Sequence, residues 1–184
     1  MTMLQPVRTA LLVIDLQERL LPTIQDQARV VRSGVALLRL ARVLDLPVVL
    51  TTQYQRGLGP TVSTILAEAA GNLPLDKTSF GCFGDEAFRT RLQSLGRKQL
   101  VVCGVETHIC VAQTTLGALE AGYEVHVASD AVGARSPANH EVGLRRMERA
   151  GAVLSSAEMA IYELLGRSDG AAFKRMLPFI KEQP

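Results

Sequence analysis

The chain has 184 residues, of which 47% are hydrophobic, 21% are charged and only 4% are aromatic, with no Trp. This length predicts one domain over residues 1–184, and burying about 70% of its unfolded surface gives a core that needs no disulfide or metal. The 20 basic and 18 acidic residues give a formal net charge of +2. The densest basic group, Arg145, Arg146 and Arg149, has the spacing of a solvated helix face, so the composition argues against a nucleic-acid-binding protein.

The three cysteines, Cys82, Cys103 and Cys110, form no C-x-x-C pair, and one is left over in any pairing scheme. Their spacing fits neither a zinc site nor a disulfide framework, and reduced thiols are typical of cytoplasmic proteins. The apolar run from Ala10 to Ile14 is too short for a signal peptide or a membrane span. We therefore expect a cytoplasmic protein that does not associate with a membrane.

Short apolar runs without polar alternation predict strands that are covered on both faces. They occupy residues 10–14, 48–51, 100–103, 125–128 and 152–154, and a weaker candidate lies at residues 73–75, just before Lys77. Apolar residues at helical spacing predict helices over residues 30–44, 111–119, 138–150, 158–165 and 171–177. The alternation predicts a three-layer α/β/α domain with a mostly parallel sheet. In mid-strand, Cys103 and His126 are expected to be structural core residues, His126 with its polar atoms satisfied.

Ligands bind beyond the carboxyl ends of the strands in such a sheet, so residues that follow strands carry the most information. Asp15 directly follows the first apolar run, where a carboxylate is costly unless it is paired or functional; the alternative is a turn-forming Asp. Cys110 stands where a helix is expected to begin, and the helix dipole and unpaired N–H groups there lower the pKa of a thiol. The alternative for Cys110 is a buried structural Cys. Lys77 taken alone would be a surface residue.

Together these three side chains suit nucleophilic catalysis by a thiol. A cation stabilises a thiolate, and a carboxylate can accept the thiol proton and return it to a leaving amine. Backbone N–H groups at the start of the helix can hold the oxyanion of a tetrahedral intermediate. The combination indicates hydrolysis of an amide through a thioester.

Three segments in order, Val13–Gln17, Lys77–Phe80 and Gly104–Val111, resemble the motifs of isochorismatase-like cysteine hydrolases. Val125–Ala131 resembles the strand and turn that follow in this family, and the resemblance extends over almost the whole chain. It implies a parallel α/β sheet of Rossmann-like order and a homo-oligomer, at least a dimer.

The resemblance also implies roles for individual residues. Asp15 matches the family's base, Lys77 its cation and Cys110 its nucleophile. A cis peptide bond is implied between Val105 and Glu106, and the backbone N–H groups of Glu106 and Cys110 would form the oxyanion hole.

Two departures from the family pattern restrict the class of substrate that we expect. The nicotinamidase branch holds a metal ion through an Asp-x-His pair and further His residues after the second strand, but Gln53 and Gln55 stand here and no His precedes His108. We therefore expect no metal and no other cofactor. Isochorismatases proper lack the nucleophilic Cys, so Cys110 argues against isochorismate and for a small carboxamide, ureido compound or imide.

Polar and aromatic residues of the motifs are candidate contacts of this small-molecule substrate: Gln17, Gln53, Tyr54, Phe80, Thr107 and His108. Phe80 could instead be plain core, and His108 could face solvent. The Gly57-Leu58-Gly59 stretch lacks the third glycine of a dinucleotide fingerprint and is better explained as a turn. A rival function is a catalytically idle paralogue that binds a small molecule or a partner; the intact Asp15, Lys77 and Cys110 argue against it.

Overall fold

The computed structural model describes residues 3–181, so the first two and last three residues of the predicted domain lie outside the described part. Six strands form one parallel sheet in the order β3-β2-β1-β4-β5-β6, as the alternating pattern predicted. The strands are β1 (Thr9–Ile14), β2 (Val48–Gln53), β3 (Leu75–Lys77), β4 (Gln99–Val105), β5 (Glu124–Gly133) and β6 (Val153–Ser155).

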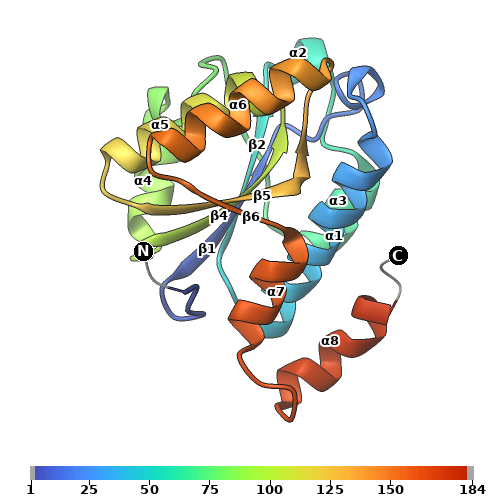
Figure 1. Cartoon of the computed structure of the whole chain (residues 1–184). Coiled ribbons are helices and arrows are strands. Elements are labelled where there is room, and N and C mark those ends of the chain that lie inside the picture. The colour runs from blue at the N-terminus through green and yellow to red at the C-terminus, as the bar shows by residue number, and fades with distance from the viewer. Residues whose placement is uncertain (1–2, 182–184) are drawn as a thin grey trace.

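Helices cover both faces of the sheet and complete the predicted three-layer α/β/α fold (Figure 1). On one face lie α1 (Gln27–Leu44), α3 (Ser63–Glu68), α7 (Ala157–Leu165) and α8 (Ala171–Lys181). On the other lie α4 (Glu86–Ser94), α5 (Ala112–Glu120) and α6 (Pro137–Arg149). Shorter turns are α2 (Gln55–Leu58), η1 (Leu21–Thr23), η2 (Cys82–Gly84) and η3 (Thr107–Val111).

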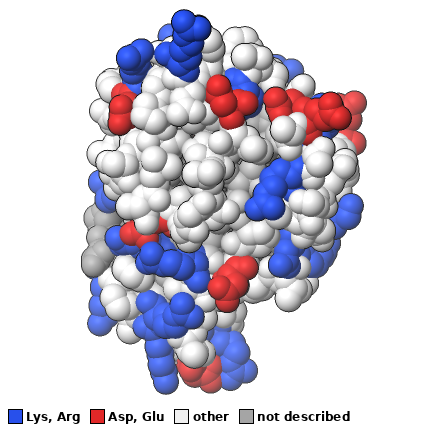
Figure 2. Space-filling model, turned by 180° about the vertical axis from the view of Figure 1, so that it is seen from behind, with Lys and Arg blue, Asp and Glu red and all other residues white. Residues whose placement is uncertain are grey.

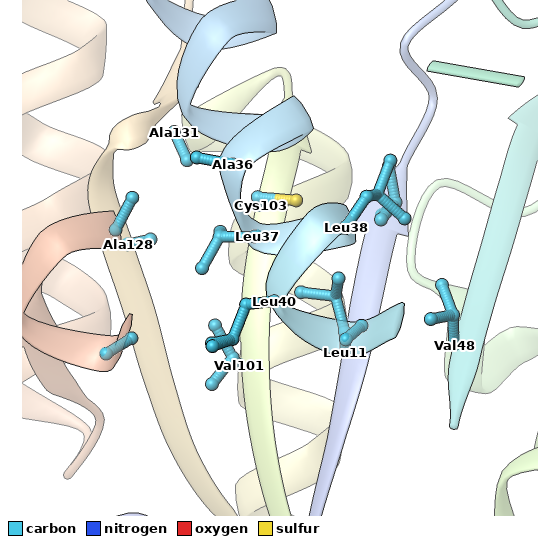
Figure 3. Close-up of a cluster of buried hydrophobic side chains, with 14 of the residues drawn as sticks. Leu11, Ala36, Leu37, Leu38, Leu40, Val48, Val101, Cys103, Ala128 and Ala131 are labelled. Carbon is cyan, nitrogen blue, oxygen red and sulfur yellow. The ribbon is translucent and has the colours of Figure 1, made fainter. Parts of the chain in front are cut away.

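The strands carry no polar alternation because both of their faces are buried. Leu11 and Val13 of β1 pack into the core beneath α1, whereas Ala10, Leu12 and Ile14 pack into the core beneath α4, α5 and α6. Figure 3 shows Leu37 and Leu40 of α1 close to Leu11 of β1 and to Val101 and Cys103 of β4. Cys103 is fully buried there, with its Sγ 3.5 Å from the carbonyl oxygen of Leu12, so it is the structural cysteine that its mid-strand position predicted.

Several elements differ from the sequence-based prediction. Helix α4 was not predicted, although the Asp85 carboxylate caps it by accepting a 3.0 Å hydrogen bond from the Phe88 N–H. Helix α3 and the single turn α2 were also missed. Strand β3 lies further along the chain than expected and ends at Lys77, because its residues pair with the last three of β2.

The prediction that His126 is satisfied is wrong. The side chain is buried in β5 with 3% exposure, but neither ring nitrogen has a hydrogen-bond partner among residues 3–181. Sheet pairing with β4 and β6 involves only the backbone of this residue, so it leaves both ring nitrogens without a partner. Burial lowers the pKa of His126, although the nearby charges of Glu163 and Glu124 oppose the effect.

Candidate active site

Four side chains meet beyond the carboxyl ends of neighbouring strands. Asp15 follows β1, Gln53 ends β2 and Lys77 ends β3, while Cys110 lies in the π-helical turn η3 after β4. Because all four strands are parallel, their carboxyl ends share one edge of the sheet, where ligands bind in this class of fold. The structure therefore brings the three predicted catalytic residues together.

A glycine allows the ends of β1 and β4 to approach closely. Gly104 has a φ of +120°, and a Cβ atom there would lie 2.0 Å from the carbonyl oxygen of Ile14. Any larger residue would push β4 away from β1 and from Asp15, which itself has a φ of 54°. This close approach positions the carboxylate next to the turn that carries Cys110.

The carboxylate and the ammonium group form a buried ion pair. Lys77 Nζ lies 2.8 Å from Asp15 Oδ2 and donates a second bond of 2.7 Å to Gln53 Oε1. The other carboxylate oxygen, Asp15 Oδ1, accepts a 2.7 Å bond from the Thr51 hydroxyl. Burial lowers the pKa of Lys77, but the Asp15 charge and two nearby thiols outweigh it and leave the pKa above its ordinary value. Lys77 is therefore charged, although only 3% of it is exposed.

Cys110 is 5% exposed, and its Sγ lies 3.9 Å from Gln53 Oε1. Burial raises the pKa of the Cys110 thiol to about 12, the Asp15 charge acts in the same direction, and the Lys77 charge only partly opposes them. The expected lowering of this pKa is therefore wrong, because desolvation and Asp15 outweigh Lys77. The resting side chain is a thiol, and its activation requires a base close to the sulfur.

The backbone before Cys110 is held by a tight turn. The Val105–Glu106 peptide bond is cis, and the carbonyl oxygen of Glu106 accepts bonds from the N–H groups of Ile109 and Val111 at 3.0 and 3.2 Å. The helical region thus begins at Thr107, earlier than predicted, and Cys110 lies within its first turn. This turn continues directly into α5.

A cavity of about 300 Å³ opens beside the thiol, a size that suits a small organic molecule. Its walls are formed by Leu20, Gln53, Leu58, Phe80, Glu106, Ile109, Cys110 and Arg135. Of the predicted substrate contacts, Gln53 and Phe80 lie on this wall. Phe80 is 56% exposed, so the alternative that it belongs to the core is wrong.

The other predicted substrate contacts lie away from the cavity wall. Gln17 is fully buried, and its amide holds both the N–H and the carbonyl of Gln53, at 2.7 and 3.1 Å, so it positions its neighbour. Tyr54 projects outward with 52% exposure, and the hydroxyl of the buried Thr107 lies 2.9 Å from His140 Nδ1. His108 is partly buried in η3, and its Nδ1 atom is buried without a partner among the described residues.

Sequence reasoning missed four wall residues: Leu20, Leu58, Ile109 and Arg135. Ile109 directly precedes Cys110, the predicted nucleophile, and could have been found from that position. The other three lie in loops and turns, whose positions cannot be predicted from a periodic sequence pattern.

Within residues 3–181, no group of three or more His, Cys, Asp or Glu side chains is arranged to hold a metal ion. None of the helices in the same range has the length and apolar character needed to cross a lipid bilayer. At the position of the family's metal ligands, Gln53 hydrogen-bonds to Lys77 and to the carbonyl oxygen of Thr78.

Comparison with known proteins identifies the family. The isochorismatase domain family matches residues 9–159. Isochorismatase domain-containing protein 2 of Pongo abelii is 39% identical over 178 residues, which are 96% of this chain and 85% of the relative. The structure of MAR1 ribonuclease from Caenorhabditis elegans superposes with a TM-score of 0.93 at 36% identity, covering 99% of this chain and 94% of the other.

Two YcaC structures superpose on this chain with similar TM-scores. The YcaC gene product of Escherichia coli, described as an octameric hydrolase of unknown specificity, gives a TM-score of 0.90 at 28% identity and covers 98% of this chain and 94% of its own. YcaC from Pseudomonas aeruginosa, with hexane-2,5-diol and covalent acrylamide, gives a TM-score of 0.91 at 30% identity. This match covers 97% of this chain and 91% of the other. Since the family match spans the strands and turns that carry Asp15, Lys77 and Cys110, this chain belongs to the isochorismatase family of hydrolases.

Proposed function

We propose that this protein is a cysteine-dependent hydrolase that cleaves the C–N bond of a small carboxamide, ureido compound or imide through a thioester on Cys110. The observation that carries the proposal is the buried Asp15–Lys77 ion pair beside the thiol, at the wall of a cavity of about 300 Å³. Buried charges are costly, and titratable groups with perturbed pKa values cluster at functional sites.

In the proposed cycle, Asp15 accepts the Cys110 proton as the sulfur attacks the carbonyl carbon. The backbone N–H groups of Glu106 and Cys110 hold the oxyanion, and collapse of the tetrahedral intermediate breaks the C–N bond. Asp15 then gives its proton to the leaving amine. Water attacks the thioester while Asp15 takes its proton, and the thiolate leaves and recovers that proton.

Lys77 stays charged throughout this cycle. It orients Asp15 and offsets the negative charge that develops on sulfur, while Gln53 holds the ammonium group from the other side. Asp15 carries every proton, so the proposed route uses no metal or other cofactor.

The covalent acrylamide in YcaC from Pseudomonas aeruginosa supports a nucleophilic mechanism, because acrylamide is a small electrophile that attaches only to a nucleophile. The rival proposal is an idle paralogue that binds a small molecule or a partner. The intact Asp15, Lys77 and Cys110 favour the enzyme.

The neighbour named a ribonuclease does not change our proposal that this chain binds no nucleic acid. On the face shown in Figure 2, basic side chains form separate groups interspersed with acidic ones instead of one continuous stripe. Arg145, Arg146 and Arg149 are exposed on α6, as expected for a solvated face. The cavity at Cys110 accommodates a small molecule.

We further propose a homo-oligomer of at least two copies in the cytoplasm, with one domain over residues 1–184. The octameric YcaC of Escherichia coli supports assembly, as does the broad area without charged side chains in Figure 2. The three free, buried thiols support a reducing compartment.

The decisive experiment screens a panel of amides, ureas and imides and then compares Cys110→Ala with the matched variant Cys103→Ala. Losing the nucleophile should lower kcat by at least roughly a thousandfold, whereas Cys103→Ala should retain turnover. Mass spectrometry of a rapidly quenched reaction should find the acyl group on Cys110. Near wild-type turnover by Cys110→Ala, with an unchanged thermal melt, would rule out covalent catalysis.

A further inference from the structure

A histidine of helix α6 is hydrogen-bonded to the turn that carries Cys110. The Nδ1 atom of His140 lies 2.9 Å from the hydroxyl oxygen of Thr107, which is fully buried at the start of η3. Gly143 follows three residues later on the same face of α6, and a Cβ atom there would lie 3.1 Å from the Thr107 carbonyl oxygen. Helix α6 therefore holds Thr107 both through its side chain and through its backbone.

The direction of this hydrogen bond follows from the charge of the imidazole. Burial and the charge of Arg29 lower the pKa of His140, although Glu141 opposes them, so the ring is neutral at neutral pH and one nitrogen has a free lone pair. The Thr107 hydroxyl has no other partner among residues 3–181. A buried hydroxyl proton without an acceptor is costly, so Thr107 donates the hydrogen bond and His140 Nδ1 accepts it.

Thr107 directly follows Glu106, whose backbone N–H is one of the two donors proposed for the oxyanion hole. The carbonyl group of Glu106 is held within the turn by the N–H groups of Ile109 and Val111. The hydrogen bond to His140 ties this same short segment to a neighbouring helix. An oxyanion-hole donor acts only within a narrow range of distances, so a small displacement of Thr107 and of the residue before it weakens the hole.

We propose, resting on the function proposed above, that His140 is a positioning residue for the oxyanion hole: by accepting the hydrogen bond of Thr107, it fixes the backbone N–H of Glu106. His140 lines a separate cavity of about 160 Å³ and is not on the wall of the cavity at Cys110, so it acts through Thr107. The opposing explanation is that His140 only satisfies a buried hydroxyl and stabilises the fold. The two explanations differ in whether removing His140 weakens the oxyanion hole of the folded protein.

The test compares two reactions of the same thiol. When butyraldehyde adds to Cys110, sulfur bonds to the carbonyl carbon, the C=O π bond opens and the thiol proton ends on the oxygen, which the oxyanion hole holds in the resulting thiohemiacetal. When iodoacetamide alkylates Cys110, sulfur displaces iodide from a methylene carbon and the thiol proton passes to solvent, so no charge develops on a carbonyl oxygen. Peptide mass spectrometry at increasing butyraldehyde concentrations gives both the alkylation rate and the dissociation constant of the thiohemiacetal.

In His140→Leu the dissociation constant should rise roughly ten- to hundredfold, while the alkylation rate without aldehyde should change less than about threefold. On an amide found by the screen, kcat should fall by a similar factor with little change in KM, because the oxyanion forms only after binding. His140→Asn should restore the wild-type behaviour, since its amide oxygen can take the place of Nδ1. The matched control Asn139→Leu, which places the same side chain at the neighbouring exposed position of α6, should have no effect.

If His140→Leu does not fold, Thr107→Val removes the same hydrogen bond from its other end and takes its place, with Thr107→Ser as the variant that keeps the hydroxyl. A lower melting temperature with unchanged aldehyde affinity overturns the proposal in favour of a purely structural role, and so does an equal loss of affinity in His140→Asn. Wild-type protein in which butyraldehyde does not protect Cys110 overturns the thioester route and this inference with it. Equal protection of wild type and His140→Leu overturns only the role of His140.

Discussion

At the scale of single residues, Lys77 and Asp15 carry opposite charges, and each charge offsets the cost of burying the other. Their side chains are 1% and 0% exposed, and their atoms are 2.8 Å apart. Removing one member of such a pair leaves an uncompensated buried charge and costs about 3–5 kcal/mol, whereas a neutral side chain of similar shape limits the damage. The three residues proposed to be catalytic lie outside the main apolar runs, so we expect their isosteric variants to fold.

Lys77→Met should slow alkylation of Cys110, because the ammonium charge is what lowers the pKa of this thiol against burial and Asp15. Asp15→Asn should act in the opposite direction on the pKa, since the Asp15 charge raises it. Asp15→Asn should nevertheless lower turnover by roughly a hundred- to ten-thousandfold, because the group that moves the proton is lost. Rates of iodoacetamide alkylation between pH 6.5 and 10 measure both shifts. Equal profiles for the two variants would contradict this assignment of charges.

Turnover should survive removal of metal ions. Gln53 hydrogen-bonds to Lys77, and Gln55 is exposed on α2, so neither position supplies the carboxylate or imidazole ligands of the metal-binding branch. The measurement is turnover before and after dialysis against a strong chelator. Full loss that added zinc or iron restores would show that a metal takes part.

His126 should make the protein less stable in acid. Its pKa is lowered in the folded state, so the unfolded chain binds the proton first as the pH falls. The stabilisation is complete above the ordinary value of 6.5 and is lost as the pH falls below it. His140, whose pKa is lowered by burial and by Arg29, adds a contribution of the same sign.

Urea denaturation at pH 7.5 and at pH 5.0 measures this difference in the free energy of unfolding. His126→Leu should make the difference smaller, and His140→Gln provides the comparison for the second histidine. An unchanged pH dependence in both variants would contradict this explanation.

The site residues that could be predicted from the sequence are those that lie just beyond the end of a strand. Asp15, Lys77 and Cys110 were found because parallel strands bring their carboxyl ends together. The raised pKa of Cys110 could not be found, because it depends on burial that only the folded chain creates. Arg135 was missed because no pattern placed its loop against Glu106.

At the scale of elements, the turn η3 is positioned by the helix packed against it. Helix α6 contacts η3 through Gly143, where a Cβ atom would lie 3.0 Å from His108 Cα and 3.1 Å from the Thr107 carbonyl oxygen. Both contacts are with backbone, which cannot rotate away. The distance between α6 and η3, which carries Cys110, is thus set by the absence of a side chain at Gly143.

Gly143→Ala should therefore lower turnover by displacing η3, while alkylation and turnover should respond little to Gly34→Ala. Gly34 is a matched control because it also lies inside a helix, α1, and its new Cβ would meet only side chains at an ordinary 3.5 Å. Both changes gain helix propensity of about 0.5–1 kcal/mol, so only the contact with η3 distinguishes them. Steady-state kinetics and thermal melts of the two variants are the measurement; equal activity would contradict a positioning role for α6.

Elements with strong local signals were predicted and those without were missed. The fully apolar runs of β1, β2 and β4 were recognised because both faces of each strand are buried. Helix α4 was overlooked despite its cap at Asp85, because only Phe88 and Leu92 mark its buried face. The π-helical start of η3 has no periodicity of its own, so the sequence placed the beginning of this helical segment too late.

At the scale of the whole molecule, the sheet offers little edge for pairing with another copy. Its two outer strands, β3 and β6, are three residues long each, and edges this short discourage strand addition between chains. Assembly is therefore expected to use the helical layers and loops. The large exposed hydrophobic side chains on these surfaces include Val142 of α6 and Met159 and Tyr162 of α7.

The protein should be a homo-oligomer at micromolar concentration. Its mean hydropathy of +0.16 and its exposed apolar side chains give a surface that gains free energy when a second copy covers it. Light scattering coupled to size-exclusion chromatography should give a mass that is a multiple of 19.9 kDa. Cys110→Ala should give the same mass, because Cys110 is 5% exposed and contributes little to an outer surface. A single 19.9 kDa species over the whole concentration range would contradict assembly, and a lower mass for Cys110→Ala alone would instead link assembly to the active site.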